Sequence, residues 1–307
     1  MKKKVILTLM MAASAASLFG QMTVGLNATA SSVPLGTSIG FSAETAQPDG
    51  STPPSLWYRY RIRAIGEHYR MIRDFGPKTD LLWAESAHEG TYVMEVTVLN
   101  LATGETAMEH SIFFVTPLAT TAPVITPTSH PLVFIYSAPG CDSGSRMRVV
   151  IQDRLGNSES TSSQACQSGM TTNVYVAGMQ PNTAYKVRQR VYTGSNFVDG
   201  PPMPVTAGAL PVKLAPYAVV QAPPPTVQQV LLQSALFEPA VATDLNGNIL
   251  WYYPSGDISY VTRPESGGRF LGVYEDSTKD QSYQVVREFD LAGNTIQETN
   301  AARINQQ

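Results

Sequence analysis

Short runs in which apolar and polar residues alternate recur along most of the chain. In "YRYRIR", Tyr58, Tyr60 and Ile62 point to one face of an extended segment and the three intervening arginines to the other, since successive side chains of a strand face opposite ways. Turn-forming segments such as "PDGSTPP", "FGPKTD" and "AHEG" separate such runs,. The pattern predicts an all-β protein built from half-buried antiparallel sheets.

Two proline-rich segments divide the sequence into three parts. They run from Thr116 to Pro131 and from Gly200 to Pro225, and crowded turn formers of this kind are typical of connections between domains. The expected modules are residues 22–118, 122–208 and 215–307.

The first two modules are expected to be β-sandwiches. "EGTYVMEVTVLN" resembles the late strand of immunoglobulin-like domains, in which a tyrosine follows a glycine at the start of the strand,. "GMQPNTAYKVRQRV" is similar to the Leu-x-Pro-x-Thr-x-Tyr segment of fibronectin type III domains, with Met179 in place of the leucine. We therefore expect an immunoglobulin-like sandwich followed by a fibronectin III-like one.

The first 21 residues, "MKKKVILTLMMAASAASLFGQ", have the order of a bacterial export signal: lysines, an apolar run and then small residues,. Residues 1–20 are interpreted as a signal peptide cleaved after Gly20, with the Ala13-Ser14-Ala15 triplet as the second candidate and a retained anchor as the remaining alternative. No later stretch approaches the roughly 18 apolar residues that cross a bilayer. We expect a periplasmic or secreted protein that does not bind the membrane once the signal is removed.

Charge and cysteine content narrow the classes further. Removing Lys2, Lys3 and Lys4 from the 21 basic residues leaves 18 against 24 acidic ones, a net charge near −6, which argues against a nucleic-acid partner. The two cysteines, Cys141 and Cys166, are expected to form a structural disulfide,. A redox or metal site, the alternative, is disfavoured because neither CxxC spacing nor a nearby histidine is present.

A repeated segment distinguishes the third module. "DLNGN" begins at Asp244 and "DLAGN" at Asp290, 46 residues later, and propeller blades repeat every 40 to 50 residues or so. Each copy lies between strand-like runs and reads as a hairpin turn; a coincidental pair of hairpins is the alternative. Because about four or more blades are needed to close a ring, residues 215–307 are expected to be the first blades of a truncated propeller. We expect no following strands to cover the edge of "VVREFDLAGNTIQETN", so that residues 215–307 exchange amide hydrogens quickly or promote association through the open edge.

The third module also carries a family resemblance. "ATDLNGNILWYYP", followed after some 30 residues by "QVVREFDLAGNTIQETNAARINQQ", resembles the bacterial arylsulfotransferase (aryl-sulfate sulfotransferase) family. The resemblance implies a six-bladed propeller with a sandwich at its amino end, a periplasmic location and often a homodimer. It also implies transfer of a sulfuryl group from a phenolic sulfate donor to a phenol acceptor through a sulfohistidine, with no cofactor.

The family's catalytic residues have no counterparts in this sequence. The four histidines, His68, His88, His110 and His130, all lie in the sandwich segments or the first linker, and none follows Gly200. No catalytic, cofactor-binding or metal-ligating residue is assigned, and we expect the chain itself to be inactive. "RINQQ" also departs from the family pattern, in which an acidic residue is expected near Gln306. The alternative function is a non-catalytic exported adhesion or glycan- or protein-binding module.

Two further groups of residues allow a structural and a functional interpretation. Trp251, Tyr252 and Tyr253 are expected to form blade core, although aromatic rings also stack on phenols. The basic stretch is expected to be a solvated sheet face, with docking to a polyanion or to the acidic third module as alternatives, docking within the chain being favoured of the two. It comprises Arg59, Arg61, Arg63, Arg70 and Arg73.

Overall fold

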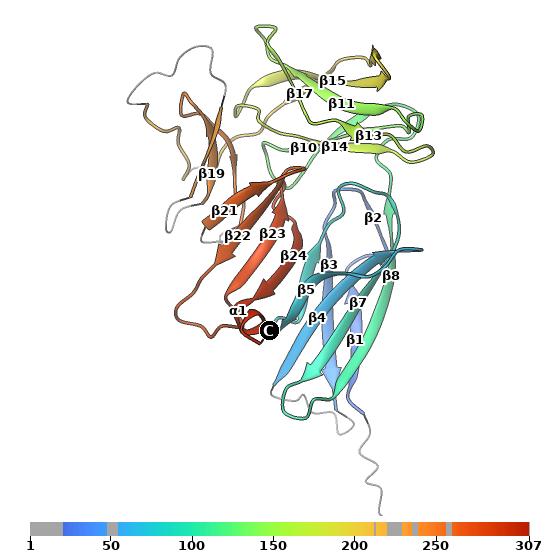
Figure 1. Ribbon diagram of the computed structural model, residues 1–307, viewed down its shortest axis with the longest axis vertical. Helices are drawn as coiled ribbons and strands as arrows, with labels where there is room; N and C mark the ends of the chain where they lie inside the picture. Colours follow the sequence, from blue (N-terminus) through green and yellow to red (C-terminus); the bar gives the residue numbers. More distant parts are fainter. Residues whose placement is uncertain are drawn as a thin grey trace, which may run out of the picture.

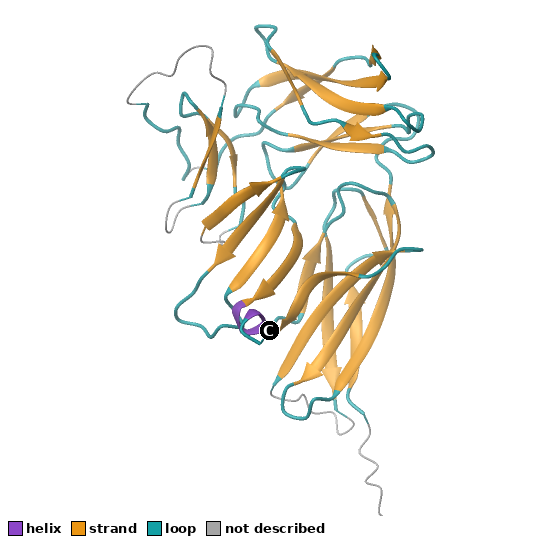
Figure 2. Cartoon of the chain, viewed as in Figure 1, coloured by secondary structure: helices purple, strands orange, loops and turns teal. Residues whose placement is uncertain are grey.

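The computed structural model describes residues 21–47, 55–211, 213–219, 229–234, 239–255 and 260–306. The segment interpreted as a signal peptide, residues 1–20, lies outside the described residues. Strands dominate the described chain, and the helix found there is the four-residue α1, Ala301–Ile304 (Figure 2). The predicted all-β fold class is confirmed.

The first module is a sandwich of two sheets (Figure 1). Its smaller sheet has the order β1-β3-β6, and its larger sheet contains β2-β8-β7-β4-β5. The predicted alternation holds in β4, where Tyr60 and Ile62 are fully buried. The strand bounds are β1 Thr23–Ala28, β2 Ser32–Pro34, β3 Ile39–Ala46, β4 Leu56–Ala64, β5 Arg70–Gly76, β6 Asp80–Trp83, β7 Gly90–Asn100 and β8 Thr106–Thr116.

Aromatic packing fills the first sandwich. The ring of Trp83 lies 5.5 Å from both Tyr92 and Phe113, and the ring of Phe41 lies 5.3 Å from Phe113. The hydroxyl of Tyr92 donates a hydrogen bond to the carbonyl oxygen of His88 at 2.8 Å. A tyrosine bonded to the backbone a few residues upstream is the tyrosine corner of immunoglobulin-like sandwiches, and it fixes the loop that enters β7.

The second module is another sandwich, with sheets β14-β10-β9 and β12-β11-β15-β16. The hydroxyl of Tyr185 accepts a hydrogen bond from the backbone N–H of Gln180 at 3.0 Å, so the tyrosine of "GMQPNTAY" also anchors a turn. β13 pairs with β11, and β17 with β15. The bounds are β9 Val124–Pro127, β10 Phe134–Ala138, β11 Arg146–Gln152, β12 Ser158–Ser160, β13 Gln164–Ala165, β14 Thr172–Val176, β15 Ala184–Thr193, β16 Asn196–Asp199 and β17 Met203–Thr206.

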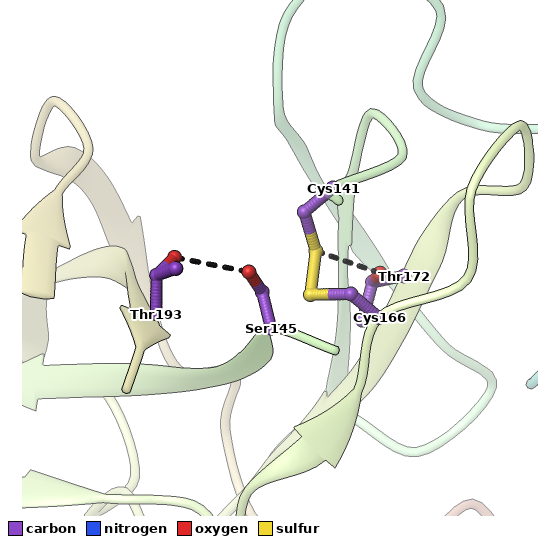
Figure 3. Close-up of a disulfide and its surroundings, with 5 residues drawn as sticks. All are labelled: Cys141, Ser145, Cys166, Thr172 and Thr193. Carbon is purple, nitrogen blue, oxygen red and sulfur yellow. Dashed lines mark hydrogen bonds between the residues drawn. A yellow bond between two sulfur atoms is a disulfide. The ribbon is translucent and has the colours of Figure 1, made fainter. Parts of the chain in front are cut away.

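The predicted disulfide between Cys141 and Cys166 is present in the second sandwich (Figure 3). It ties the segment after β10 to the segment after β13. The Sγ atom of Cys141 lies 3.6 Å from Oγ1 of Thr172, and nearby Ser145 and Thr193 share a 3.0 Å hydrogen bond between their hydroxyls. The disulfide thus closes one end of the sandwich.

The third module consists of two antiparallel sheets that pack against each other. Trp251 stacks on Phe270 with ring centres 4.6 Å apart, and its indole N–H donates to the carbonyl oxygen of Leu291 at 2.7 Å. The rings of Tyr253 and Phe289 lie 4.5 Å apart. The strands are β18 Val230–Gln233, β19 Val241–Asp244 and β20 Ile249–Tyr252 in one sheet, and β21 Tyr260–Glu265, β22 Arg269–Tyr274, β23 Val285–Asp290 and β24 Thr295–Asn300 in the other.

The two repeated segments form equivalent hairpin turns. In each, the aspartate accepts hydrogen bonds from two backbone N–H groups and from the side chain of the closing asparagine, at Asp244 and at Asp290. The same bonds form at Asp153 in "DRLGN", between β11 and β12 of the second sandwich. The Asp-x-x-Gly-Asn turn is therefore a general hairpin of this chain, and its recurrence alone does not identify a blade.

One continuous sheet joins the first and third modules. Its order is β2-β8-β7-β4-β5-β24-β23-β22-β21, because β24 pairs in parallel with β5 at Glu298 and Arg73. The prediction that the edge of "VVREFDLAGNTIQETN" lacks covering strands was wrong. The covering strand comes from the first sandwich, more than 200 residues earlier, and a pairing so distant leaves no local trace in the sequence.

Candidate functional site at the junction of the three modules

A cleft of about 750 Å³ lies where the three modules meet. Its walls come from the loop between β6 and β7, from β14 and the segment around β13, and from the hairpin that joins β23 to β24. Hydroxyl and amide side chains lie on these walls among apolar ones. They are Ser86, Thr161, Ser162, Gln164, Gln167, Thr171, Thr172, Asn173, Asn294 and Thr295.

A buried tyrosine–carboxylate pair forms one wall of the cleft. The hydroxyl of Tyr175 in β14 donates to Oδ2 of Asp290 in β23 at 2.6 Å. Burial, followed by the charge of Asp290, raises the pKa of Tyr175 well above its ordinary value. Burial also raises the pKa of Asp290, although hydrogen bonds from Tyr175 and Asn294 partly offset it. The pair joins the second sandwich to the third module, and Tyr175 retains its proton at neutral pH.

Glu89 joins the first sandwich to the second beside the cleft. Its carboxylate accepts hydrogen bonds from the backbone N–H and the hydroxyl of Thr171, both at 2.7 Å. Burial acts to raise the pKa of Glu89, but these hydrogen bonds prevail and hold it below its ordinary value. The amide of Asn173 donates to the carbonyl oxygen of Ala87 at 2.8 Å, while its Oδ1 is buried and, within the described part of the chain, lacks a partner. Asn173 thus holds the loop before β7 against β14 beside the cleft.

The arginines of the cleft are largely neutralised. Arg269 pairs with Glu288 at 2.8 Å, and Arg70 lies 3.7 Å from the carboxylate of Glu85. Searching the described residues for three His, Cys, Asp or Glu side chains that could hold a metal ion finds no such group. The hydroxyl and amide groups of the cleft can form hydrogen bonds with a polar ligand.

A buried ion network lies where β5 meets β24. Glu298, only 3% exposed, accepts hydrogen bonds from Arg73 of the first sandwich and, at 2.7 Å, from Arg287 of β23. Arg287 also donates to the hydroxyl of Tyr253 at 3.2 Å. Burial acts to raise the pKa of Glu298, but the charges of Arg73 and Arg287 outweigh it and lower the pKa. The network extends the sheet pairing into the side chains.

The four histidines are scattered across the structure. His68 is exposed between β4 and β5, and His88 is exposed at the cleft. His110 on β8 lies 3.2 Å from the carboxylate of Glu95. His130 is fully buried between the second sandwich and the third module, where it contacts the backbone of Tyr252. The structure does not gather them into one site.

The basic stretch serves two purposes. Arg73 binds Glu298, and Arg70 donates to the carbonyl oxygen of Ile296 at 3.5 Å. This end of the stretch therefore docks onto the third module, which was one of the alternatives drawn from the sequence. The other end stays on the outer face of the first sandwich. There Arg61 donates to Glu95 at 2.7 Å and, like Arg63, lies over the ring of Tyr69, while Arg59 lies over Phe75.

The aromatic run after the first repeat lies inside the protein. Trp251, Tyr252 and Tyr253 are 3%, 7% and 2% exposed. The core interpretation is correct for all three, because side chains so deeply buried present no face on which a phenol could stack.

Comparisons with known proteins give no family. No protein-family model matches the chain, and no curated protein matches it. Among solved structures it is similar to the FN1–FN3 domains of chicken CNTN1, at 8% identity and a TM-score of 0.25, over 58% of this chain and 65% of that one. It is also similar to the chicken interferon gamma receptor alpha chain, at 8% identity and a TM-score of 0.24, over 62% of this chain and 99% of that one. The described residues include no helix long and apolar enough to cross a membrane.

Proposed function

We propose that this chain belongs to an exported protein related to the arylsulfotransferases, in which the two sandwiches hold the first blades of a propeller. The observation that carries the proposal is the packing of two antiparallel sheets through Trp251, Phe270 and Phe289, each sheet containing an Asp-Leu-x-Gly-Asn hairpin. Successive propeller blades pack face to face in this way. The sequence resemblance over residues 230–307 supports the same assignment.

The proposed reaction moves a sulfuryl group between two phenols. A histidine attacks the sulfur of a phenolic sulfate, the phenol departs with the bonding electron pair, and a second phenol takes the sulfuryl group from the sulfohistidine. The sequence of the third module holds no histidine. We therefore propose that the third module contributes blades that the sandwiches hold and orient, and that the nucleophilic histidine lies elsewhere in the protein.

Export is part of the proposal. The Cys141–Cys166 disulfide supports it, since structural disulfides persist in oxidising compartments such as the periplasm. The lysine-rich, apolar leader supports it as well,. Mass spectrometry of secreted protein tests both points, because the mature chain is expected to begin near Gln21 and to keep the two cysteines linked.

An activity assay tests the proposed reaction. The complete reading frame containing these residues is expressed and incubated with a chromogenic phenyl sulfate and a phenol acceptor. We expect phenol-dependent turnover with that product and none with the 307-residue chain. Absence of turnover in both would contradict the proposal, and turnover by the 307-residue chain after replacement of all four histidines would overturn the sulfohistidine mechanism.

The cleft favours a second candidate function, a non-catalytic glycan- or protein-binding module. Its walls carry amide and hydroxyl groups from all three modules, Asn173 among them. Groups of this kind orient polar ligands without reacting with them. Saturable binding of a neutral oligosaccharide that Asn173→Ala weakens, with no sulfuryl transfer by the complete protein, would favour this candidate over the enzyme.

A further inference from the structure

The outer face of the large sheet in the second sandwich gathers positive charge. Along β11 and β15, alternate residues point inward, and Met147, Val149 and Val187 are fully buried. The residues between them point outward, since strand side chains alternate between faces. The outward cations are Arg146 and Arg148 on β11, and Lys186, Arg188 and Arg190 on β15.

This face lies away from the other modules. In Figure 1, β11, β15 and β17 form the layer of the second sandwich farthest from the first and third modules, whereas β10 and β14 lie on the side toward them. The inner layer makes the contacts between modules, for example through Tyr175 to Asp290. The cations on β11 and β15 are thus not used to hold the three modules together.

The positive charges exceed their partners. Asp199 on β16 is the carboxylate of this face: it pairs with Arg190 at 2.5 Å and with Arg188 at 3.2 Å. Hydrogen bonds from Arg190 and then Arg188 lower the pKa of Asp199 to about 2. Within the described chain, Arg146, Arg148 and Lys186 form no ion pair. Five cations therefore share this face with the ionised carboxylate of Asp199.

The arrangement has a local energetic cost. Arg148 and Arg190 are direct cross-strand partners, and like charges placed opposite each other destabilise a sheet. The rings of Tyr192 and Phe197 hold the two guanidinium groups, at 5.0 Å and 4.2 Å from the respective ring centres. The pair of arginines therefore does not stabilise the sheet. An anion bound above both guanidinium groups would reduce the repulsion between them.

The same face offers groups suited to sugars. Phe197 remains 52% exposed beside Arg190, so its ring is open to a sugar ring as well as to the cation. Ser160 and Ser158 on β12 are exposed and lie opposite Val150 and Gln152 of β11. A flat face about four strands wide, at roughly 4.8 Å per strand, fits an extended polymer better than a single small anion.

We propose that the outer face of β11 and β15 binds a sulfated polysaccharide. Arginine guanidinium groups match planar arrays of anionic oxygens, the hydroxyls suit sugar hydroxyls, and the exposed ring suits a sugar face. The exposed serine hydroxyls and the exposed ring of Phe197 favour a sugar polymer, and binding of nucleic acid is an outcome that the test below distinguishes. This binding site goes beyond the proposed sulfuryl transfer and does not depend on it.

Titration of the full chain with size-defined heparin fragments at two salt concentrations tests the proposal. We expect saturable binding that weakens as salt rises, because binding releases condensed counterions. Neutral dextran is expected not to bind, and a polyuronate is expected to bind at least tenfold more weakly than heparin. Equal affinity for the polyuronate or for duplex DNA would overturn the sulfated polysaccharide as the ligand.

A pair of matched variants locates the site. Arg148→Glu with Lys186→Glu is expected to weaken heparin binding at least tenfold, while Arg263→Glu with Lys279→Glu, an equal charge change on the third module, is expected to leave it within twofold. Because Arg148 faces Arg190, the first variant is expected to melt no earlier than wild type,. Equal loss in the two variants would overturn the assignment of the site to this face.

Discussion

His130 donates a hydrogen bond from Nε2 to the carbonyl oxygen of Tyr252, 2.8 Å away and 122 residues further along the chain. Its Nδ1 accepts a hydrogen bond from the backbone N–H of Leu132 at 3.1 Å, so the proton of the neutral ring lies on Nε2. The ring is fully buried and 4.4 Å from that of Tyr252. One neutral imidazole thus connects the second sandwich to the third module.

Acid is expected to weaken this connection. Burial lowers the pKa of His130 from 6.5 to about 4, against a smaller opposing effect of the hydrogen bond to Tyr252. The unfolded chain therefore binds a proton at higher pH than the folded chain. The contribution of His130 to the free energy of unfolding is complete above pH 6.5 and is lost as the pH falls toward 4. The loss over this window is about 3 kcal/mol. Urea unfolding at pH 7 and pH 4.5 measures it.

Two variants separate His130 from other acid-sensitive groups. His130→Gln is expected to be less stable than wild type at pH 7 and to show a flatter pH dependence between 6.5 and 4. His88→Gln, at an exposed position, is expected to retain the wild-type dependence. A wild-type slope that persists in His130→Gln would rule out the imidazole as its source.

Glu298→Gln tests the ion network between β5 and β24. The substitution leaves Arg73 and Arg287, with side chains 12% and 7% exposed, without their shared charge partner. Removing one partner of a buried pair destabilises by about 3 to 5 kcal/mol. Glu265→Gln, which breaks the exposed pair with Arg263, is expected to change stability by less than about 1 kcal/mol. Similar losses in the two variants would contradict a special role for the network.

The three Asp-x-x-Gly-Asn turns offer an internally controlled series. Gly156, Gly247 and Gly293 all have positive φ, at 93°, 79° and 87°, a conformation that costs a residue with a Cβ about 1 kcal/mol or more. A Cβ on Gly247 would lie 2.2 Å from the carbonyl oxygen of Tyr217 and one on Gly293 2.5 Å from Pro254, whereas one on Gly156 meets no atom within 4 Å. Alanine is expected to destabilise most at Gly247 and least at Gly156. Thermal midpoints in the opposite order would contradict the described packing of the third module.

The disulfide is expected to stabilise the second sandwich. It closes a loop of 25 residues between Cys141 and Cys166, which corresponds to about 3 kcal/mol in the chain-entropy model. Cys141→Ser with Cys166→Ser is expected to lower the free energy of unfolding by that order. As a control, the wild-type protein and the double variant are both unfolded with and without reductant. Reductant is expected to destabilise only the wild-type protein, and an effect that persists in the double variant would have another origin.

Local patterns predicted much of each strand but little of the assembly. The alternation around Tyr60 and the turn at Asp244 act over a few residues, and both take the predicted form. The Asp153 turn shows the limit of that reasoning, since the same letters close a hairpin in a sandwich. Burial separates Asp290, which binds Tyr175, from Asp153, which is only partly buried. The turn motif alone does not encode that difference, because Asp290 is covered by Tyr175 from another module.

The candidate site was beyond the reach of sequence reasoning for a related reason. The cleft, Glu89 with Thr171, and Arg73 with Glu298 join residues 82 to 225 positions apart. The cleft and both contacts depend on how the three modules pack against one another. The excess of arginine against the acidic third module gave one usable signal, since docking within the chain was an alternative for the basic stretch and Arg73 does bind Glu298.

Amide hydrogen exchange at β24 measures most directly whether the sandwiches hold the third module. The backbone N–H groups of Thr295–Asn300 are expected to exchange at least tenfold more slowly in wild type than in Glu298→Gln, because pairing with β5 and the ion network close that edge,. The strand β21, at the far end of this sheet as described, is expected to exchange equally in both proteins. Exchange of β24 as fast as that of surface loops in the wild-type protein would contradict the account.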